Sequence, residues 1–133
     1  MSAMRRHIAL VFVLTVAAAA IGAGFTLAVR ADSEPREIVL TARGMAFYLD
    51  GGDTPNPDIM VRPGEQVRFV LRNEAPGFLH DLVIPDLGVA LEPIAAGGSR
   101  AVVVRIPALS APVRYVCRPH ALMMSGTIVP SGS

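Results

Sequence analysis

The chain has 133 residues, of which 52% are hydrophobic, and its formal net charge is +1. All twelve basic residues are arginine, and the chain contains one cysteine and three histidines. A single cysteine excludes an intramolecular disulfide framework and any metal site built only from cysteine. The near-neutral charge, without basic runs, argues against a nucleic-acid partner. The absence of lysine excludes Schiff-base chemistry and a P-loop.

The N-terminal segment is apolar and carries its charges at its two ends. Arg5 and Arg6 precede an uncharged stretch over residues 8–29, and Arg30 ends it. As a helix this stretch would be about 33 Å long, which is enough to cross a bilayer. The pattern therefore predicts one hydrophobic export segment over residues 1–31, with Arg5 and Arg6 left in the cytoplasm.

Two interpretations of this export segment stay open. The small residues Val29 and Ala31 suit a cleavable signal peptide, with a mature start at Asp32. The apolar run is longer than the core of about 7–15 residues in a usual signal peptide, which favours a retained N-terminal membrane helix. Both interpretations place residues 32–133 outside the cytoplasm, in the periplasm or at the cell surface.

The exported part, residues 32–133, is expected to be a small all-β domain. It holds nine arginines and eleven acidic residues, which gives a net charge of −2, and no segment of it keeps a helical period. Proline and glycine recur between short β-branched runs, which is typical of a β-sandwich or barrel. Strands are expected over residues 37–42, 45–49, 59–62, 66–72, 80–84, 100–106, 113–117 and 126–129.

Two metal-binding side chains lie on apolar faces of these expected strands. His80 shares a face with Leu82, and Cys117 shares a face with Tyr115, because alternate residues of a strand point the same way. We therefore expect His80 and Cys117 to enter the same end of the core.

The segment after Cys117 supplies further donors. His120 lies three residues on, and Met123 and Met124 follow it. A thiolate, two imidazoles and a weak thioether form the donor set of a trigonal copper site. A zinc site would need another hard or thiolate donor, and the loop contains none. A catalytic Cys–His pair is a minor alternative, because two methionines lie close to it and the chain has no distinct substrate motif. The sequence predicts one copper ion bound by His80, Cys117, His120 and a methionine, without enzymatic activity.

These segments resemble the cupredoxins, the small blue copper proteins, over residues 37–130. Residues 56–67, Asn-Pro-Asp-Ile-Met-Val-Arg-Pro-Gly-Glu-Gln-Val, look like the family's entry into its central strand. Asn73 followed by His80 looks like the stretch with the first histidine ligand, and residues 117–129 look like the C-terminal ligand loop and last strand. The resemblance implies a two-sheet Greek-key β-sandwich with His80, Cys117 and His120 as the strong ligands.

The resemblance leaves two methionines as candidates for the axial ligand. Amicyanin-like loops have two residues between histidine and methionine, which would select Met123. Plastocyanins, azurins and amicyanins also place a glycine two residues after the axial methionine, and Gly126 stands at that distance from Met124. We therefore expect Met124 to be the axial ligand and Met123 to lie at the edge of the site.

The chain departs from the family at the link between its two ligand segments. Many cupredoxins have an asparagine after the first histidine ligand, bonded to a serine or threonine beside the cysteine. This chain has Asp81 and Arg118 at those positions. We predict that an Asp81–Arg118 ion pair replaces that link.

Residues 80–88 also look like the copper domain of cytochrome c oxidase subunit II, which uses two cysteines for a binuclear centre. Because Cys117 is alone, a mononuclear site is expected. The sequence thus predicts a monomeric, extracytoplasmic carrier of single electrons, with His120 as the exit. Its partners would be redox proteins such as a c-type cytochrome or a respiratory complex, and the membrane if residues 1–31 are retained. Copper delivery or storage, and an accessory domain of a respiratory oxidase, are the alternatives.

Overall fold

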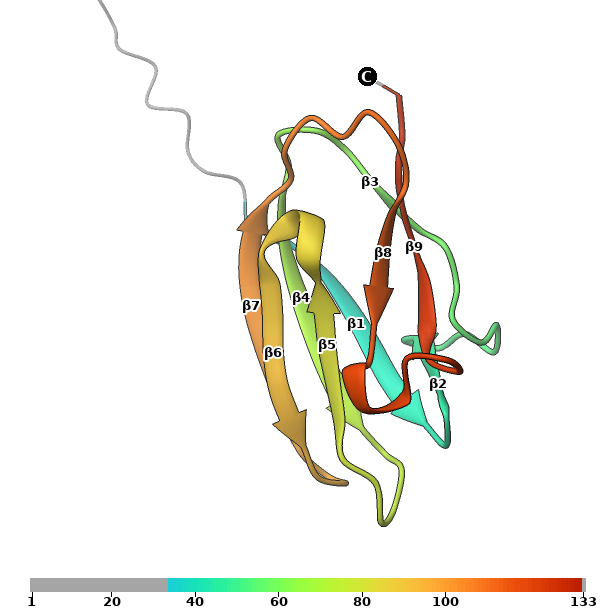
Figure 1. Cartoon of the computed structure of the whole chain (residues 1–133). Helices are drawn as coiled ribbons and strands as arrows, with labels where there is room; N and C mark the ends of the chain where they lie inside the picture. The colour runs from blue at the N-terminus through green and yellow to red at the C-terminus, as the bar shows by residue number, and fades with distance from the viewer. Residues whose placement is uncertain (1–33, 133) are drawn as a thin grey trace, which may run out of the picture. The chain divides into compact units, whose positions relative to one another are not determined.

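The computed structural model describes residues 34–132, which form two packed β-sheets (Figure 1). The first sheet has the strand order β2 (Ala46–Leu49), β1 (Arg36–Arg43), β4 (Gln66–Asn73) and β7 (Ser99–Arg105). The second has the order β3 (Ile59–Val61), β9 (Ser125–Pro130), β8 (Val113–Val116), β5 (His80–Ile84) and β6 (Val89–Ile94). Two single-turn 3-10 helices, η1 (Pro85–Leu87) and η2 (Arg118–His120), lie in the loops. The predicted all-β class is confirmed.

The predicted hydrophobic helix within residues 1–31, and the boundary between that segment and the domain, lie outside the described residues. Between residues 34 and 132, no helix is both long enough and apolar enough to span a membrane.

The strand order brings segments that are distant in sequence side by side. β1 pairs in parallel with β4 and β3 with β9, whereas the other pairs are antiparallel. The chain therefore crosses between the sheets after β2, β3, β4, β6 and β7. β1, β4 and β8 end where β5 begins, and we call this the site end of the sandwich (Figure 1). The opposite end, where β1 begins, is the entry end.

Alternation along the strands builds the core between the sheets. In β4, Phe69 and Leu71 are fully buried, whereas Arg68 and Arg72 on the other face are exposed. Burying an apolar side chain of this size stabilises the fold by about 1.5–3 kcal/mol. The period of two in the sequence therefore identifies the face of β4 that packs against the second sheet.

β6 is a strand that the sequence does not predict, because Pro93 lies within it. A proline cannot donate to a ladder and is confined to positions such as an edge strand. β6 is the edge of the second sheet and pairs there with β5. Gly88, at φ 65°, ends η1 and turns the chain back into β6, a left-handed conformation that favours glycine.

Candidate metal centre

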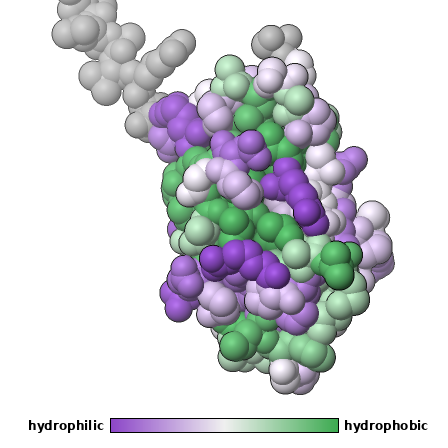
Figure 2. Space-filling model, viewed as in Figure 1, coloured by the Kyte–Doolittle hydropathy of each residue, from purple (hydrophilic) through white to green (hydrophobic). Residues whose placement is uncertain are grey.

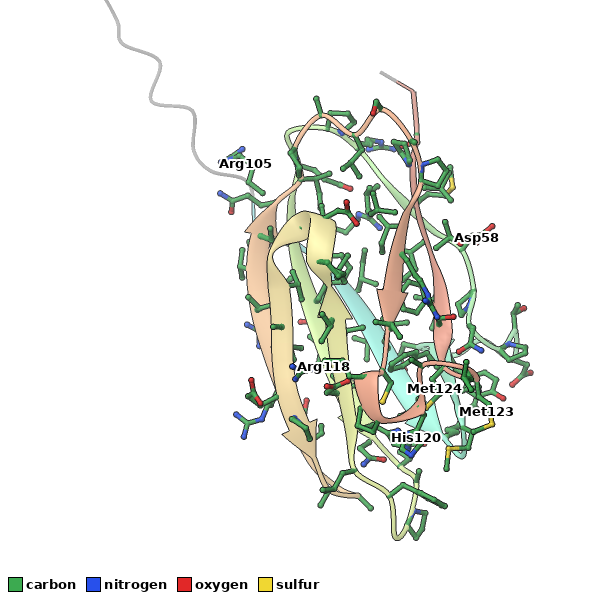
Figure 3. All side chains as sticks on the ribbon, viewed as in Figure 1. Asp58, Arg105, Arg118, His120, Met123 and Met124 are labelled. Carbon is green, nitrogen blue, oxygen red and sulfur yellow. The ribbon has the colours of Figure 1, made fainter. Side chains whose placement is uncertain are left out.

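Three donor side chains from two segments meet at the site end, where Figure 3 labels His120. His80 begins β5, Cys117 directly follows β8, and His120 ends η2. Cys117 Sγ lies 3.7 Å from His80 Nδ1 and 3.6 Å from His120 Nδ1. All three donor atoms lie within 4.8 Å of one another. The predicted convergence of His80 and Cys117 is therefore seen.

The spacing of these donors fits a single metal ion. Metal–nitrogen bonds of about 2.0–2.1 Å and metal–sulfur bonds of about 2.3 Å would allow one ion to bind both donors only if these lie less than about 4.4 Å apart. The sulfur–nitrogen distances of 3.6 and 3.7 Å fall below that limit. The two sulfur–nitrogen distances are thus compatible with one ion held by Cys117 and the two histidines.

The loop that carries Cys117 and His120 is closed by its own backbone. The Cys117 N–H donates to the carbonyl of Met124 at 3.0 Å, and the Met124 N–H donates to the carbonyl of His120 at 2.8 Å. Pro119 sits in the first turn of η2, where its missing N–H costs nothing. These bonds fix Met124 beside Cys117 and His120 along the chain.

The two candidate methionines differ sharply in exposure. The side chain of Met124 is fully buried, whereas Met123 is 55% exposed. A Cβ on Gly126 would overlap the ring of Tyr115, its cross-strand partner, so this position has room only for glycine. Packing against Tyr115 therefore explains why residue 126, whose distance from Met124 identified the axial candidate, is a glycine.

The predicted pair between Asp81 and Arg118 forms. The Arg118 backbone N–H donates to Asp81 Oδ1 at 2.7 Å, and Arg118 Nε donates to Asp81 Oδ2 at 2.6 Å. The Asp81 side chain is 1% exposed, while Arg118 is half exposed. Because Asp81 follows His80 and Arg118 follows Cys117, the pair ties the two ligand segments together.

Burial favours the uncharged forms of His80 and Cys117. Burial lowers the pKa of His80, and the neighbouring His120 lowers it further. The carbonyl of Gly44 opposes this shift, but His80 Nε2 is buried and makes no hydrogen bond within residues 34–132. Burial also raises the pKa of the Cys117 thiol, which is fully buried. The lowered pKa of His80 leaves its imidazole free to bind a metal, whereas the raised pKa of Cys117 means that a metal must displace the thiol proton.

Apolar side chains surround His120 at the surface. Phe78 stacks on the His80 ring, with centroids 6.2 Å apart, and meets the edge of the His120 ring at 6.0 Å. His120 itself is partly exposed. Apolar surface is visible at the lower, site end in Figure 2. We call the exposed residues here the apolar rim: Phe78, Leu79, Leu122 and Met123.

Sequence reasoning missed two residues that contact the site. Phe78 packs against both histidine rings, and the side chain of Asn56 donates to the carbonyl of Met123 at 2.8 Å. The aromatic residue two positions before His80 was a usable signal. Asn56 gave none, because its contact depends on how a remote loop folds.

The two-sheet sandwich and its His–Cys–His cluster define a domain with the cupredoxin fold. No family model and no curated protein sequence matches the chain. Among solved structures, reduced auracyanin from the photosynthetic bacterium Roseiflexus castenholzii aligns at a TM-score of 0.58 and 16% identity, covering 72% of this chain and 97% of that one. Rusticyanin from Thiobacillus ferrooxidans aligns at 0.57 and 21% identity, covering 71% and 76%. A heme-copper terminal oxidase aligns at 0.58 and 17% identity, covering 74% and 66%.

Proposed function

We propose that the protein binds one copper ion and carries single electrons between redox partners outside the cytoplasm. The cluster of His80, Cys117 and His120 carries this proposal, because a thiolate with two imidazoles is a donor set that suits copper. Bound copper would supply a one-electron couple between Cu(I) and Cu(II). The similarity to a heme-copper oxidase supports the choice of metal.

The protein's contribution is to hold the ligands still. His80 is fixed at the start of a strand, and Cys117 and His120 belong to one closed turn. A donor set that moves little between oxidation states favours fast electron exchange, whether or not the geometry is strained. The Asp81–Arg118 pair adds a link between the two segments.

We propose Met124 as the weak axial ligand. Its burial beside Cys117 supports this choice, whereas Met123 is half exposed. Met124→Leu should raise the reduction potential of the copper-loaded protein, because loss of a donor disfavours Cu(II) more than Cu(I). Met123→Leu is the matched control and should leave the potential unchanged. The reverse result in protein-film voltammetry would assign the axial position to Met123.

Electron transfer is favoured over catalysis by the burial of the ligands. His80 and Cys117 are fully buried, which leaves little room for a substrate to approach an ion held between them. His120 is partly exposed within the apolar rim and offers a path for an electron to the surface. A small apolar patch of this kind suits a weak, transient complex with a redox protein such as a c-type cytochrome or a respiratory complex. We propose that the protein does this as a monomer, in the periplasm or at the cell surface.

Copper delivery is the second candidate, because the exposed thioether of Met123 lies beside the cluster and could accept Cu(I). The two functions predict different visible absorption spectra for the copper-loaded protein. Cu(II) added to the purified protein should give an intense blue thiolate-to-copper band if copper is held by His80, Cys117 and His120. Cys117→Ser should abolish the band. A colourless or weakly coloured wild-type complex would refute the electron-carrier proposal and leave delivery.

A further inference from the structure

The loop between β2 and β3 contains the one non-glycine residue with positive φ among the described residues. Asn56 has φ 49°, a left-handed conformation that is uncommon for any residue with a side chain. Asparagine tolerates it better than most, at a small cost. Such a backbone persists only where the surrounding contacts hold it.

The side chain of Asn56 uses both of its polar atoms to join separate parts of the molecule. Its Oδ1 accepts from the Phe47 N–H in β2 at 3.0 Å. Its Nδ2 donates to the carbonyl of Met123 at 2.8 Å, across 67 positions of sequence. The next carbonyl, that of Pro57, accepts from the Tyr115 hydroxyl at 2.7 Å. The segment of Asn56 and Pro57 therefore contacts both the ligand loop and the strand that leads into Cys117.

The bond to Met123 acts on the peptide that joins Met123 to Met124. Hydrogen bonds within the loop fix Met124 relative to Cys117 and His120. The Arg118–Asp81 pair holds the start of the loop against β5. Asn56 holds the end of the same loop against the β2–β3 side of the sandwich.

We infer that Asn56 is a positioning residue for the copper site, which sets how closely Met124 approaches the ion. The inference rests on the proposed function. An axial thioether is a weak, long ligand, so its distance is set by the protein around it rather than by the bond. A residue that fixes the adjoining peptide therefore tunes the reduction potential without touching the ion.

Two variants separate the side-chain bonds from the backbone. Asn56→Asp keeps the size of the side chain and the acceptor for Phe47, but turns the donor facing Met123 into a second oxygen. Asn56→Gly removes both bonds and suits the positive φ. Thr54→Asp is the matched control, because Thr54 is exposed in the same loop and gains the same charge without losing a contact to Met123.

In the copper-loaded full chain, both Asn56 variants should weaken copper affinity by about tenfold or more, as removal of outer-sphere partners does elsewhere. Both should also shift the visible spectrum and the reduction potential in the same direction, whereas Thr54→Asp should change neither spectrum nor affinity. Thermal unfolding of the metal-free variants identifies any that fail to fold. Wild-type spectra and potentials in folded Asn56→Asp and Asn56→Gly would overturn the inference.

A double-mutant cycle tests the route through Met124. In a Met124→Leu background, Asn56→Gly should no longer shift the potential, because the residue it positions is gone. A shift of equal size in both backgrounds would overturn the inference and assign Asn56 a general structural role. If the wild-type protein gives no blue band, the proposed function fails. If it does, and the Asn56 variants match it, only the role of Asn56 fails.

Discussion

At the scale of single residues, Asp81 is a buried charged group next to His80 in the chain. Its carboxylate is 1% exposed and accepts from both the backbone and the side chain of Arg118. A buried carboxylate without hydrogen-bond donors would destabilise the fold. The two hydrogen bonds from Arg118 remove that cost and hold Arg118 against β5. The ion pair is thus part of the ligand scaffold rather than a surface contact.

Asp81→Ala should lower the copper affinity by about 10–100-fold, because the start of the ligand loop loses its link to β5. Asp81→Asn keeps an acceptor for the Arg118 N–H and should retain most of the affinity. Titration of each metal-free variant with copper, followed by its visible absorption, measures the difference. An Asp81→Ala protein with wild-type affinity and potential would show that the pair is not needed by the site.

The sequence predicts the three residues of the His–Cys–His cluster better than it predicts the residues that position them. His80, Cys117 and His120 could be chosen because residues 32–133 contain two histidines and one cysteine, all within two expected strands and one loop. Met124 could be chosen from its distance to a glycine. Asn56 could not be found, because its role depends on a left-handed backbone and on contact with a loop 67 positions away.

At the scale of elements, β8 and β9 form the hairpin that carries the ligand loop. Tyr115 in β8 and Gly126 in β9 are directly paired, and the Tyr115 ring lies where a side chain on Gly126 would be. The Tyr115 hydroxyl, donating to Pro57, is fully buried with its ring. Because Gly126 in β9 has no side chain, the Tyr115 ring of β8 packs over its backbone. This contact fixes the register of β8 and β9 next to Cys117.

Gly126→Ala should destabilise the protein by about 1–3 kcal/mol, the usual cost of forcing extra volume into a packed core. The new methyl group would displace the Tyr115 ring and break its bond to Pro57. Urea unfolding followed by circular dichroism gives the free energy of unfolding. Gly132→Ala is the control, since nothing lies within 4 Å of that position. Equal midpoints for the two variants would contradict the packing argument.

The unpredicted strand shows where local sequence rules fail. Pro93 argues against a strand when the residues are taken alone, and it is tolerated because β6 lies at a sheet edge. Val89 and Leu91 lie two positions apart and are both buried, with exposed Ala90 between them, as the period of a strand predicts. Whether a strand lies at the edge or in the centre of a sheet depends on the strand order, which is set by pairings between strands far apart in the chain.

At the scale of the whole molecule, the entry end is secured separately from the site end. Arg36, at the start of β1, donates to both carboxylate oxygens of Glu65 and to the Met60 carbonyl. Glu65 also accepts from the backbone N–H of Arg62 at 2.7 Å. The described domain is therefore entered at the end away from His120.

Acid should weaken the entry end through protonation of Glu65. The hydrogen bond from Arg36 holds the pKa of Glu65 below its usual value of 4.5, so the folded state favours the charged form. This stabilisation is fully present above the unfolded pKa and is lost as the pH falls through the lower folded value. Glu65→Gln should cost about 1 kcal/mol at pH 7, the upper end for solvent-screened pairs, and little at pH 2–3. Unfolding free energies at both pH values measure this, and an equal loss at both would contradict it.

A charge added to the apolar rim should slow electron transfer more than the same charge added elsewhere on the surface. The proposed exit through His120 requires the apolar rims of two copper-loaded copies to meet, so Leu122→Glu should slow self-exchange at least about tenfold through like-charge repulsion at the contact. Val103→Glu is the matched control, because Val103 is an exposed apolar residue on β7 in the other sheet. Line broadening in nuclear magnetic resonance spectra of mixed oxidation states gives the rates. Equal slowing by both variants would mean that net charge, not the rim, governs the contact, and no slowing by either would place the electron's exit elsewhere.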